Sequence, residues 1–461
     1  MNAATGAPQP SAPSGHNPSV RSLAPDLARG LMLMLIAAAN VSWFLWGRES
    51  SETGVHLTDG SILDRVAQFV MIVTVDGRIY PLFAFLFGYG MVQFVRSRLG
   101  RDEPYPEVRR MLRRRHWTML LLIGPLHAAL LFMGDIVAAY GLVALILVGI
   151  FFDRQERTLW ICVWILVGLW ALNAVFSIMG GVGMALFSPD LIPLMSKGMP
   201  DIQGMTVGQE NYLWSIVGRL GMWAMGGLTQ GIISAVPITI LLGWIAARRG
   251  ILDNPAAHKP LLQRVALFGI AIGWLGGLPS ALTHVGVLTV PSWTFTGLDT
   301  IAGAAGAVGY VALFGLLAAH WQSAPPAPIR WVAAVGKRSL TFYLWQSLIF
   351  APLFSAWGFG VGGTVGTAGA LGIAMLVWLA SVPIAVLLER RGARGPAEAV
   401  LRRITYGRVG TSGMNAGAQY PNGRPEAPPP YPPPGAEQLQ GAHPNVDHPQ
   451  TERIPGPEQD R

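Results

Sequence analysis

The chain has 461 residues, of which 51% are hydrophobic and 13% are charged, and its mean hydropathy is +0.42. Soluble globular proteins carry about 25% charged residues, so this composition argues against that class and predicts a membrane protein. The net charge of +8 does not predict a nucleic-acid partner, because the basic residues border long apolar segments. The single cysteine, Cys162, excludes an intramolecular disulfide and a cysteine metal cluster.

Apolar segments long enough to cross a bilayer as helices recur along the chain. They predict an all-α, polytopic integral membrane protein with about ten transmembrane helices. The segment 212–221, which carries Arg219, is predicted to lie at the membrane interface. The ten predicted spans cover approximately residues 30–46, 66–95, 117–133, 136–152, 158–186, 225–247, 265–282, 298–319, 340–357 and 366–388.

The loop between the second and third predicted spans sets the orientation. Short loops rich in arginine stay on the cytoplasmic side of a membrane. With ten spans, every basic cluster and both termini fall on that side, so we expect a multi-pass protein of the cell inner (plasma) membrane, surrounded by the lipid bilayer. The arginines of this loop are Arg96, Arg98, Arg101, Arg109, Arg110, Arg113, Arg114 and Arg115.

Three regions are predicted from composition. Residues 1–24 are rich in Pro, Ser, Ala and Gly and should be disordered, without a cleavable signal peptide. Residues 25–406 form the multi-spanning membrane domain, whose first span is expected to act as an uncleaved anchor. Residues 407–461 form a proline-rich, disordered tail. That tail either keeps the protein soluble at the surface or binds a protein partner; both readings stay open.

The first predicted span carries Arg29 and Asn40, eleven residues and about 16 Å apart on one helix face. Arg29 would bind substrate at the cytoplasmic mouth, and Asn40 would lie deeper, near the chemistry. The alternative is structural: Arg29 anchors the topology, and Asn40 makes a hydrogen bond between helices.

Asp76 and Arg78 fall near the middle of the second predicted span, beside Gly77 and just before Pro81. A helix interrupted by Gly and Pro exposes backbone groups, which is tolerated in a membrane only where they line a cavity or a buried site. We therefore interpret both charges as substrate-binding residues. They could instead simply neutralise each other.

His127 lies within the third predicted span, eight residues before Asp135 at the predicted outer turn. A carboxylate can orient an imidazole that exchanges protons, so the pair predicts a general base. A packing histidine is the alternative. His56, His284 and His320 are scattered without the spacing of a metal motif, so no metal site is expected.

The ninth predicted span carries Tyr343, Gln346 and Ser347 at helical spacing, which forms one polar stripe. The stripe either binds a ligand, with Tyr343 and Gln346 as substrate contacts, or holds helices together. The sequence contains no nucleotide P-loop, no nucleophile elbow and no dinucleotide fingerprint. The common signatures of soluble enzymes are therefore missing.

Several segments together resemble the YeiB-like family of bacterial multi-spanning membrane proteins, over about residues 24–407. They are Asp26-Leu27-Ala28-Arg29-Gly30 with Asn40, residues 81–90 (PLFAFLFGYG), Leu126-His127, Gly134-Asp135-Ile136, Tyr140-Gly141-Leu142, residues 338–347 (RSLTFYLWQS), Gly395-Pro396 and residues 402–406 (RRITY).

That family is similar to the transmembrane acyltransferase superfamily, which includes the acyltransferase-three proteins and the lysosomal heparan acetyltransferase. In the acyltransferase-three pattern the first span holds an arginine and, eleven residues later, a histidine. This chain has Arg29 but presents Asn40 at the histidine position. It thus resembles the arginine–asparagine version of the heparan enzyme, and the residue that would act as base is left open.

The resemblance implies an acyl-CoA-dependent acyltransferase that modifies a hydroxyl or amine of a glycan, lipid or small molecule in the membrane or envelope. Acyl-CoA would be a co-substrate, and no bound cofactor is expected. Its phosphates would dock on Arg29 and on Arg113, Arg114 and Arg115 of the loop. His127 with Asp135 would supply the base. Arg78 or Asn40 would stabilise the oxyanion.

The alternative function is a transporter or exporter of a small polar or anionic solute, which the interrupted second span also fits. A membrane scaffold or sensor is the third reading, supported mainly by the proline-rich tail.

Overall fold

The computed structural model describes residues 22–50, 56–193 and 201–406, so both predicted tails lie almost wholly outside the described residues. The elements named within these ranges are all helices, which confirms the all-α class. Within the same ranges an antiparallel bridge joins Ser50 and Leu57.

The α-helices are α1 (Leu23–Val41), α2 (Ile62–Thr74), α3 (Ile79–Leu99), α4 (Tyr105–Thr118), α5 (Gly124–Leu130), α6 (Ile136–Ile150), α7 (Glu156–Phe187), α9 (Ile202–Met205), α10 (Tyr212–Met222), α11 (Leu228–Ile232), α12 (Val236–Arg248), α13 (Lys259–His284), α14 (Thr296–His320), α15 (Ala327–Gly336), α16 (Ser339–Phe354), α17 (Thr367–Arg390) and α18 (Pro396–Tyr406). Short 3-10 or π segments are η1 (Ser42–Phe44), η2 (Met119–Ile123), η3 (Pro189–Leu191), η4 (Trp223–Gly227), η5 (Ser292–Phe295) and η6 (Val361–Gly363).

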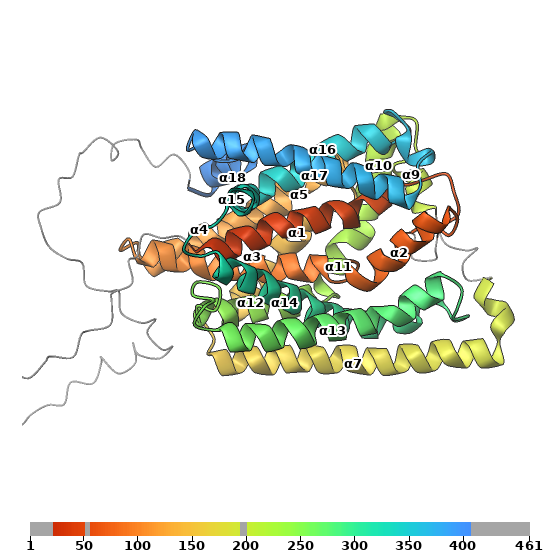
Figure 1. Cartoon of the computed structure of the whole chain (residues 1–461), viewed down its shortest axis with the longest axis horizontal. Helices are drawn as coiled ribbons and strands as arrows, with labels where there is room; N and C mark the ends of the chain where they lie inside the picture. Colours follow the sequence, from red (N-terminus) through yellow and green to blue (C-terminus); the bar gives the residue numbers. More distant parts are fainter. Residues whose placement is uncertain (1–21, 51–55, 194–200, 407–461) are drawn as a thin grey trace, which may run out of the picture.

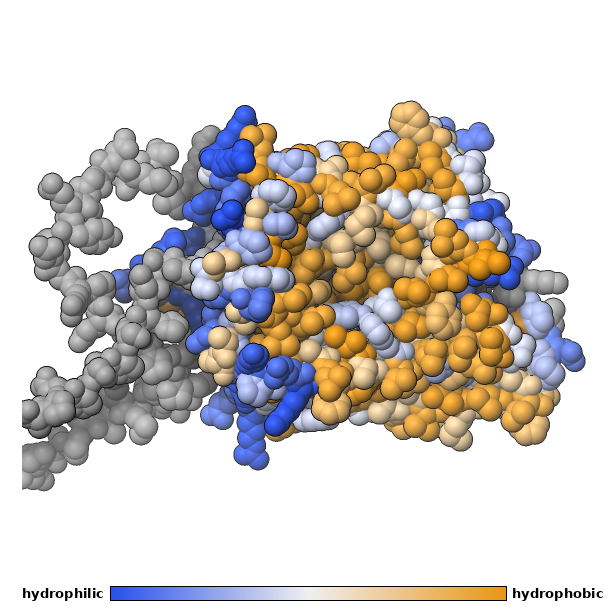
Figure 2. All heavy atoms as spheres, viewed as in Figure 1, coloured by the Kyte–Doolittle hydropathy of each residue, from blue (hydrophilic) through white to orange (hydrophobic). Residues whose placement is uncertain are grey.

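The long helices run side by side along one axis, and α1 lies inside the bundle, in contact with α3, α14, α15, α16 and α17 (Figure 1). The surface is apolar along most of that axis and hydrophilic towards its two ends (Figure 2). The end that carries the α3–α4 connection and α18 is called the basic end below. An apolar belt between polar ends is the pattern of a protein embedded in lipid.

Fewer helices than the ten predicted spans meet the length and hydropathy expected of a membrane span in the described residues. In the described part of the chain six helical segments are long and apolar enough to cross a bilayer, and a bent pair, Tyr212–Ile232 with Val236–Arg248, would make a seventh. The six are Leu23–Phe44, Ile62–Leu99, Glu156–Phe187, Lys259–His284, Ser292–His320 and Thr367–Arg390.

Two of the ten predicted spans correspond to short helices. α6 has 15 residues and α16 has 16, which at 1.5 Å per residue gives about 22–24 Å, less than the roughly 30 Å hydrocarbon core of a bilayer. The prediction of ten spans and of the side on which the termini lie is therefore not confirmed, whereas the membrane class is supported by the six segments.

The second predicted span is broken, as its sequence predicts. α2 ends at Thr74 and α3 begins at Ile79, and Gly77 between them has a φ of +72°, a left-handed conformation that favours glycine. The start of α2 is fixed by a capping box, in which Ser61 and Asp64 satisfy each other's backbone N–H groups.

α4, η2 and α5 form one continuous helical run, which returns through α6 as a hairpin. The turn is covered by α10: the Tyr212 hydroxyl donates to the carbonyl of Leu130 at 3.1 Å, and Arg219 donates through Nε to the carbonyl of Ala129 at 3.0 Å. The Asp135 side chain at this turn has no exposed surface. The predicted turn at Asp135 is therefore buried, because α10 packs over it.

Arg219 on α10 is buried. Its relative exposure is 0%, and its guanidinium lies over the Tyr212 ring at 5.3 Å. The backbone of α5 accepts its hydrogen bonds, a partner that no local pattern reveals. The segment is one arm of the bent pair, and its place at the membrane interface stays a prediction.

α18 fixes the start of α16 at the basic end. The Glu398 carboxylate accepts from the backbone N–H of Leu340 at 2.8 Å and of Thr341 at 3.1 Å, which satisfies two of the free donors at that helix start.

Replacing Glu398 by Ala is expected to lower the free energy of unfolding by about 1 kcal/mol or more, the usual effect of a lost helix cap. Thermal unfolding of the purified protein would measure the effect. Glu210→Ala, at an exposed position, is the control and should leave the melting temperature unchanged. Equal melting temperatures for both variants would show that the cap contributes nothing.

Candidate functional site

The centre of the candidate site is a buried histidine–aspartate pair. His127 Nδ1 lies 2.8 Å from Asp135 Oδ1, and the two side chains are 1% and 0% exposed. The other oxygen of Asp135 caps α6 by accepting from the backbone N–H of Ala138 at 2.8 Å. An Nδ1–H group that donates to the Asp135 carboxylate leaves the lone pair of the neutral imidazole on Nε2. Nε2 is buried and has no hydrogen-bond partner among the residues that the structure describes.

Tyr343 on α16 joins this pair, as the predicted stripe suggests. Its ring centroid lies 5.2 Å from that of His127, and its hydroxyl accepts from the backbone N–H of Ile136 at 3.4 Å. Tyr343 therefore contacts the dyad and the first residue of α6 together.

Asn40 is linked to the same region by two tyrosines. The Tyr80 hydroxyl donates to Asn40 Oδ1 at 2.9 Å, and the Tyr140 hydroxyl donates to the backbone carbonyl of Tyr80 at 2.6 Å. Tyr140 belongs to α6, the helix that Asp135 caps. The members of this central polar cluster are Asn40, Tyr80, His127, Asp135, Tyr140 and Tyr343.

Tyr80 and Tyr140 are members that the sequence reasoning missed as site residues. Tyr140 stands in one of the segments that carry the family resemblance, and Tyr80 directly precedes Pro81. A tyrosine hydroxyl within an apolar span could therefore have indicated both residues as site candidates.

Gln346 makes a contact between helices, as the structural alternative for the polar stripe predicts. Its Nε2 donates to the backbone carbonyl of Leu33 at 2.8 Å, which joins α16 to α1, and the residue is 2% exposed. Its Oε1 is buried without a hydrogen-bond partner in the described part of the chain. Gln346 therefore supports the helix that carries Tyr343, and its free oxygen leaves a substrate contact open.

Arg29 points into the bundle. Its guanidinium lies 3.5 Å from Asp26 Oδ1 and donates to the backbone carbonyl of Leu86 on α3 at 3.3 Å. Arg29 is thus bonded between two helices, nearer the basic end than Asn40 on the same helix.

Arg78 forms a second polar centre at the break between α2 and α3. The residue is 2% exposed, and its guanidinium donates to the carbonyl of Gly273 at 2.6 Å, to that of Ile72 at 3.3 Å and to that of Asp76. The carboxylate facing it is Asp299, at 3.9 Å. The sequence missed Asp299, because the residue belongs to α14, more than 200 positions further along the chain.

Asp76 and Arg78 do not pair through their side chains. The Asp76 carboxylate instead lies 2.5 Å from His56 Nε2, and the His56 ring packs against that of His284 with centroids 5.7 Å apart. The side chain of Asp76 is thus bonded to His56, whereas that of Arg78 is bonded to backbone carbonyls and faces Asp299.

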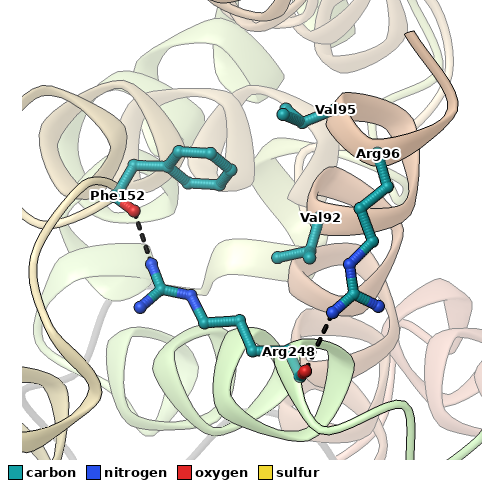
Figure 3. A pocket seen from close by; sticks show the side chains of 5 residues that line it. All are labelled: Val92, Val95, Arg96, Phe152 and Arg248. Carbon is teal, nitrogen blue, oxygen red and sulfur yellow. Dashed lines mark hydrogen bonds between the residues drawn. The ribbon is translucent and has the colours of Figure 1, made fainter. Parts of the chain in front are cut away.

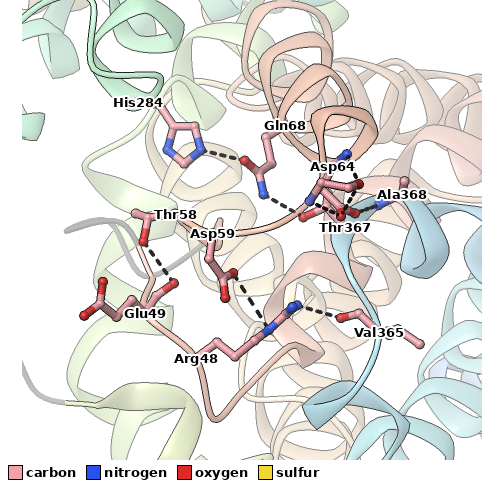
Figure 4. A network of polar contacts seen from close by, with 11 residues as sticks. Arg48, Glu49, Thr58, Asp59, Asp64, Gln68, His284, Val365, Thr367 and Ala368 are labelled. Carbon is pink, nitrogen blue, oxygen red and sulfur yellow. Dashed lines mark hydrogen bonds and ion pairs between the residues drawn. The ribbon is translucent and has the colours of Figure 1, made fainter.

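The network continues from His284 to α2 and α17 (Figure 4). His284 Nε2 lies 3.1 Å from Gln68 Oε1, and Gln68 Nε2 donates to Thr367 Oγ1 at 3.0 Å. Polar contacts thus run from the break in the second span to the far end of the bundle. Among the described residues no group of three or more His, Cys, Asp or Glu is arranged to hold a metal ion.

Two glycines allow α13 and α14 to pack closely against the break between α2 and α3. A Cβ at Gly303 on α14 would lie 2.2 Å from the carbonyl oxygen of Gly77, a backbone atom that cannot turn aside. On α13, a Cβ at Gly277 would lie 2.1 Å from a guanidinium nitrogen of Arg78. The close approach of α14 to the break therefore depends on the missing side chain at Gly303.

Gly303→Ala is expected to lower the free energy of unfolding by about 1–3 kcal/mol, the usual effect of overpacking. Gly168→Ala is the matched control, since nothing lies within 4 Å of the Cβ that it adds. Thermal unfolding of both variants would measure the difference, and an unshifted melting temperature for Gly303→Ala would contradict the close approach.

The arginines of the loop do not share one face. Arg113 and Arg114 are exposed, whereas Arg115 is half-buried and lies 6.0 Å from the Phe94 ring. A further pair, Arg96 and Arg248, lines a recess at the same end of the bundle. Arg248 belongs to α12, so the loop sequence alone could not indicate this pair.

These features define an all-helical integral membrane protein whose bundle buries a histidine–aspartate pair and a guanidinium. Residues 246–408 match a family described as "Protein of unknown function (DUF418)". The matched region contains Asp299, Tyr343 and Gln346, while Arg78 and the dyad precede it.

Two curated relatives match most of the chain. The uncharacterised protein YeiB of Escherichia coli is 26% identical over 406 residues, which cover 85% of this chain and 97% of the relative. The uncharacterised protein YxaH of Bacillus subtilis is 24% identical over 417 residues, which cover 83% of this chain and 93% of the relative. Together with the matched family, they support a YeiB-like family for this chain, as its sequence predicts.

Proposed function

We propose that this protein is a membrane-embedded acyltransferase that uses acyl-CoA and acylates a hydroxyl or amine of a glycan, lipid or small molecule. The observation that carries the proposal is the dyad. His127 is oriented through Nδ1 by a buried carboxylate, while Nε2 is free to take a proton. This is the arrangement that general-base catalysis requires.

In the proposed reaction His127 Nε2 removes the proton from the acceptor hydroxyl or amine as that oxygen or nitrogen attacks the thioester carbonyl carbon. The carbon–sulfur bond then breaks, and the CoA thiolate leaves with the proton that Nε2 returns. Asp135 stays ionised and stabilises the imidazolium that forms in between. A positioned base of this kind contributes about 10²–10⁴-fold to the rate.

Asn40 is the proposed oxyanion contact. Tyr80 holds Asn40 Oδ1 at 2.9 Å, so the amide nitrogen presents the donors of this side chain. Arg78, the other residue considered for this role, donates to three backbone carbonyls, which supports the choice of Asn40 over Arg78.

The hairpin connects the dyad to the basic end. α4 carries most of the arginines of the predicted loop, and α6 leads back towards the start of α7, where Arg249 pairs with Glu156. We propose that this end faces the cytoplasm, the side that supplies acyl-CoA, and that the exposed Arg113 and Arg114 attract its phosphates.

A direct test measures free CoA, the thiol that acyl transfer releases. The purified protein in lipid nanodiscs would be mixed with labelled acetyl-CoA and a bacterial envelope extract, and free CoA and labelled product would be measured. We expect CoA release that depends on both the protein and the extract. Absence of acceptor-dependent release with acetyl-CoA and with a longer acyl-CoA would reject the proposal.

Transport of a small anionic solute is the second candidate, because the second span is broken at a buried arginine. Uptake of labelled organic anions into proteoliposomes would test it. The rate of transport should fall in Arg78 variants and stay unchanged in His127 variants. The rate of acyl transfer should instead fall in His127 variants.

A further inference from the structure

A cluster of arginines surrounds Tyr406 at the basic end. Two guanidinium groups lie over the Tyr406 ring, that of Arg98 on α3 at 4.4 Å and that of Arg402 on α18 at 5.0 Å from the ring centroid. Arg98 also lies 5.7 Å from the Phe94 ring, and α18 packs against α4. Helices that are far apart in the sequence thus bring their cations to one aromatic centre.

Three exposed arginines of this cluster form no ion pair and no side-chain hydrogen bond with any residue that the structure describes. Two nearby carboxylates are already engaged: Glu103 pairs with Arg98 at 2.6 Å, and Glu398 accepts from the backbone N–H groups at the start of α16. The three arginines are Arg101, Arg394 and Arg402.

These positive charges lie close enough to act on one another. Partial burial and the positive charge of Arg394 lower the pKa of the Arg402 guanidinium, and two further arginines of the cluster act in the same direction. Residues 98–116 contain seven arginines against three acidic residues, and residues 390–406 contain five against one. The cluster therefore has a surplus of positive charge that the carboxylates of these segments cannot neutralise.

The backbone between α17 and α18, which carries Arg394, is anchored to the start of α16. The Arg338 guanidinium donates to the carbonyl of Ala393 at 2.6 Å, and the backbone N–H of Ala397 donates to Thr341 Oγ1 at 3.1 Å. These contacts fix the positions from which the arginines of the cluster extend. A bound anion would therefore lower their mutual repulsion without a change of fold.

The arginines of the recess at the same end are held differently. Arg96 donates to the carbonyl of Arg248 at 2.8 Å, and Arg248 donates to that of Phe152 (Figure 3). In the described part of the chain no carbonyl accepts from the guanidinium groups of Arg394 and Arg402. The donors available to a ligand are therefore those of the cluster around Tyr406.

The cluster lies where two candidate membrane spans end. The span Ile62–Leu99 ends one residue after Arg98, and the span Thr367–Arg390 ends four residues before Arg394. Figure 2 shows the surface changing from apolar to hydrophilic towards this end. Lipid headgroups lie at this depth, at the border of the hydrocarbon core.

We propose that the arginine cluster around Tyr406 binds the phosphate headgroup of an anionic phospholipid. Guanidinium groups match phosphate oxygens in charge and geometry. Clusters of basic residues directly beside a membrane span attract anionic headgroups. The lipid is favoured over a soluble phosphate because the cluster lies at the depth of the headgroups. The site does not depend on the reaction proposed for the dyad.

The test uses the full-length protein in phosphatidylcholine nanodiscs. The melting temperature would be measured while short-chain phosphatidylglycerol is added, with short-chain phosphatidylcholine as the probe without net charge and CoA as the soluble phosphate. We expect a saturable rise of the melting temperature with phosphatidylglycerol and none with phosphatidylcholine.

The variants are Arg402→Gln, Arg394→Gln and Arg402→Lys. The control is Arg157→Gln, because Arg157 is exposed at the start of α7, on the other side of the bundle from α18 (Figure 1). We expect either glutamine variant to weaken phosphatidylglycerol binding by about fivefold or more, the effect of one arginine beside an anionic headgroup. Arg402→Lys should lie between these and the parent protein, and Arg157→Gln should stay within about twofold of it.

A rise with phosphatidylglycerol that both glutamine variants weaken supports the proposal. No rise with phosphatidylglycerol overturns it, as does equal binding by the parent protein and the glutamine variants. A rise with CoA alone also overturns it and assigns the cluster to a soluble phosphate. If one glutamine variant fails to fold, the other and Arg402→Lys still decide. Because binding is read without turnover, failure here is distinguishable from failure of acyl transfer.

Discussion

Replacing His127 by Gln is expected to lower the rate of acyl transfer by about 10²–10⁴-fold, the contribution of a positioned general base. Glutamine keeps a polar side chain in the buried space but has no group that accepts and returns a proton at neutral pH. Acceptor-dependent CoA release by the purified variant, measured beside the parent protein, gives the ratio. CoA release at the parent rate would remove His127 from the chemistry.

Asp135→Asn is the second variant. It separates the cap that Asp135 provides to α6 from its contact with His127. Asparagine caps a helix as well as aspartate does, so α6 should keep its start and the melting temperature should change little. The negative charge that stabilises the imidazolium is lost, so kcat should fall while the KM for acyl-CoA stays nearly constant. A fall in stability without a fall in kcat would assign Asp135 to structure alone.

Replacing Arg78 by Met is expected to destabilise the protein by about 3–5 kcal/mol, because a buried charge network loses one partner. Methionine fills a similar space but cannot donate to the carbonyls of Gly273, Ile72 and Asp76, and it leaves Asp299 without the facing cation. The yield of monodisperse protein and its melting temperature should both fall.

The control for this experiment lies in the same broken span. Arg65 on α2 is exposed, so Arg65→Met should change the melting temperature little. Adding Asp299→Asn to Arg78→Met should restore part of the loss, since it removes the carboxylate that was left unpaired. Parent-like stability of Arg78→Met, or no recovery in the double variant, would contradict the network described here.

Local features predicted the positions of several elements well. The break between α2 and α3 follows from Gly77, whose left-handed backbone needs no partner elsewhere. The spans around α1, α7, α13, α14 and α17 follow from long apolar runs, because hydropathy is a property of neighbouring residues. His127 and Asp135 lie eight residues apart across one hairpin turn, so their pairing could also be anticipated from the chain itself.

Other features depend on contacts between residues that are far apart in the sequence. The turn at Asp135 is buried because α10 covers it, and Arg219 is buried because the backbone of α5 accepts its hydrogen bonds. The Asp299 carboxylate facing Arg78 and the Tyr80 hydroxyl bonded to Asn40 each belong to another helix. Neither pair has a spacing that a helical or hydropathy pattern could show.

The sequence by itself thus determined the class of protein, the apolar segments and the place where the second span breaks, because these depend on residues adjacent in the chain. Only the tertiary structure decided which polar groups meet: the central polar cluster draws on α1, α3, α5, α6 and α16, and the recess places Arg96 beside Arg248. Inside an apolar bundle a polar side chain must find its partner wherever packing places one, and that packing involves the whole chain.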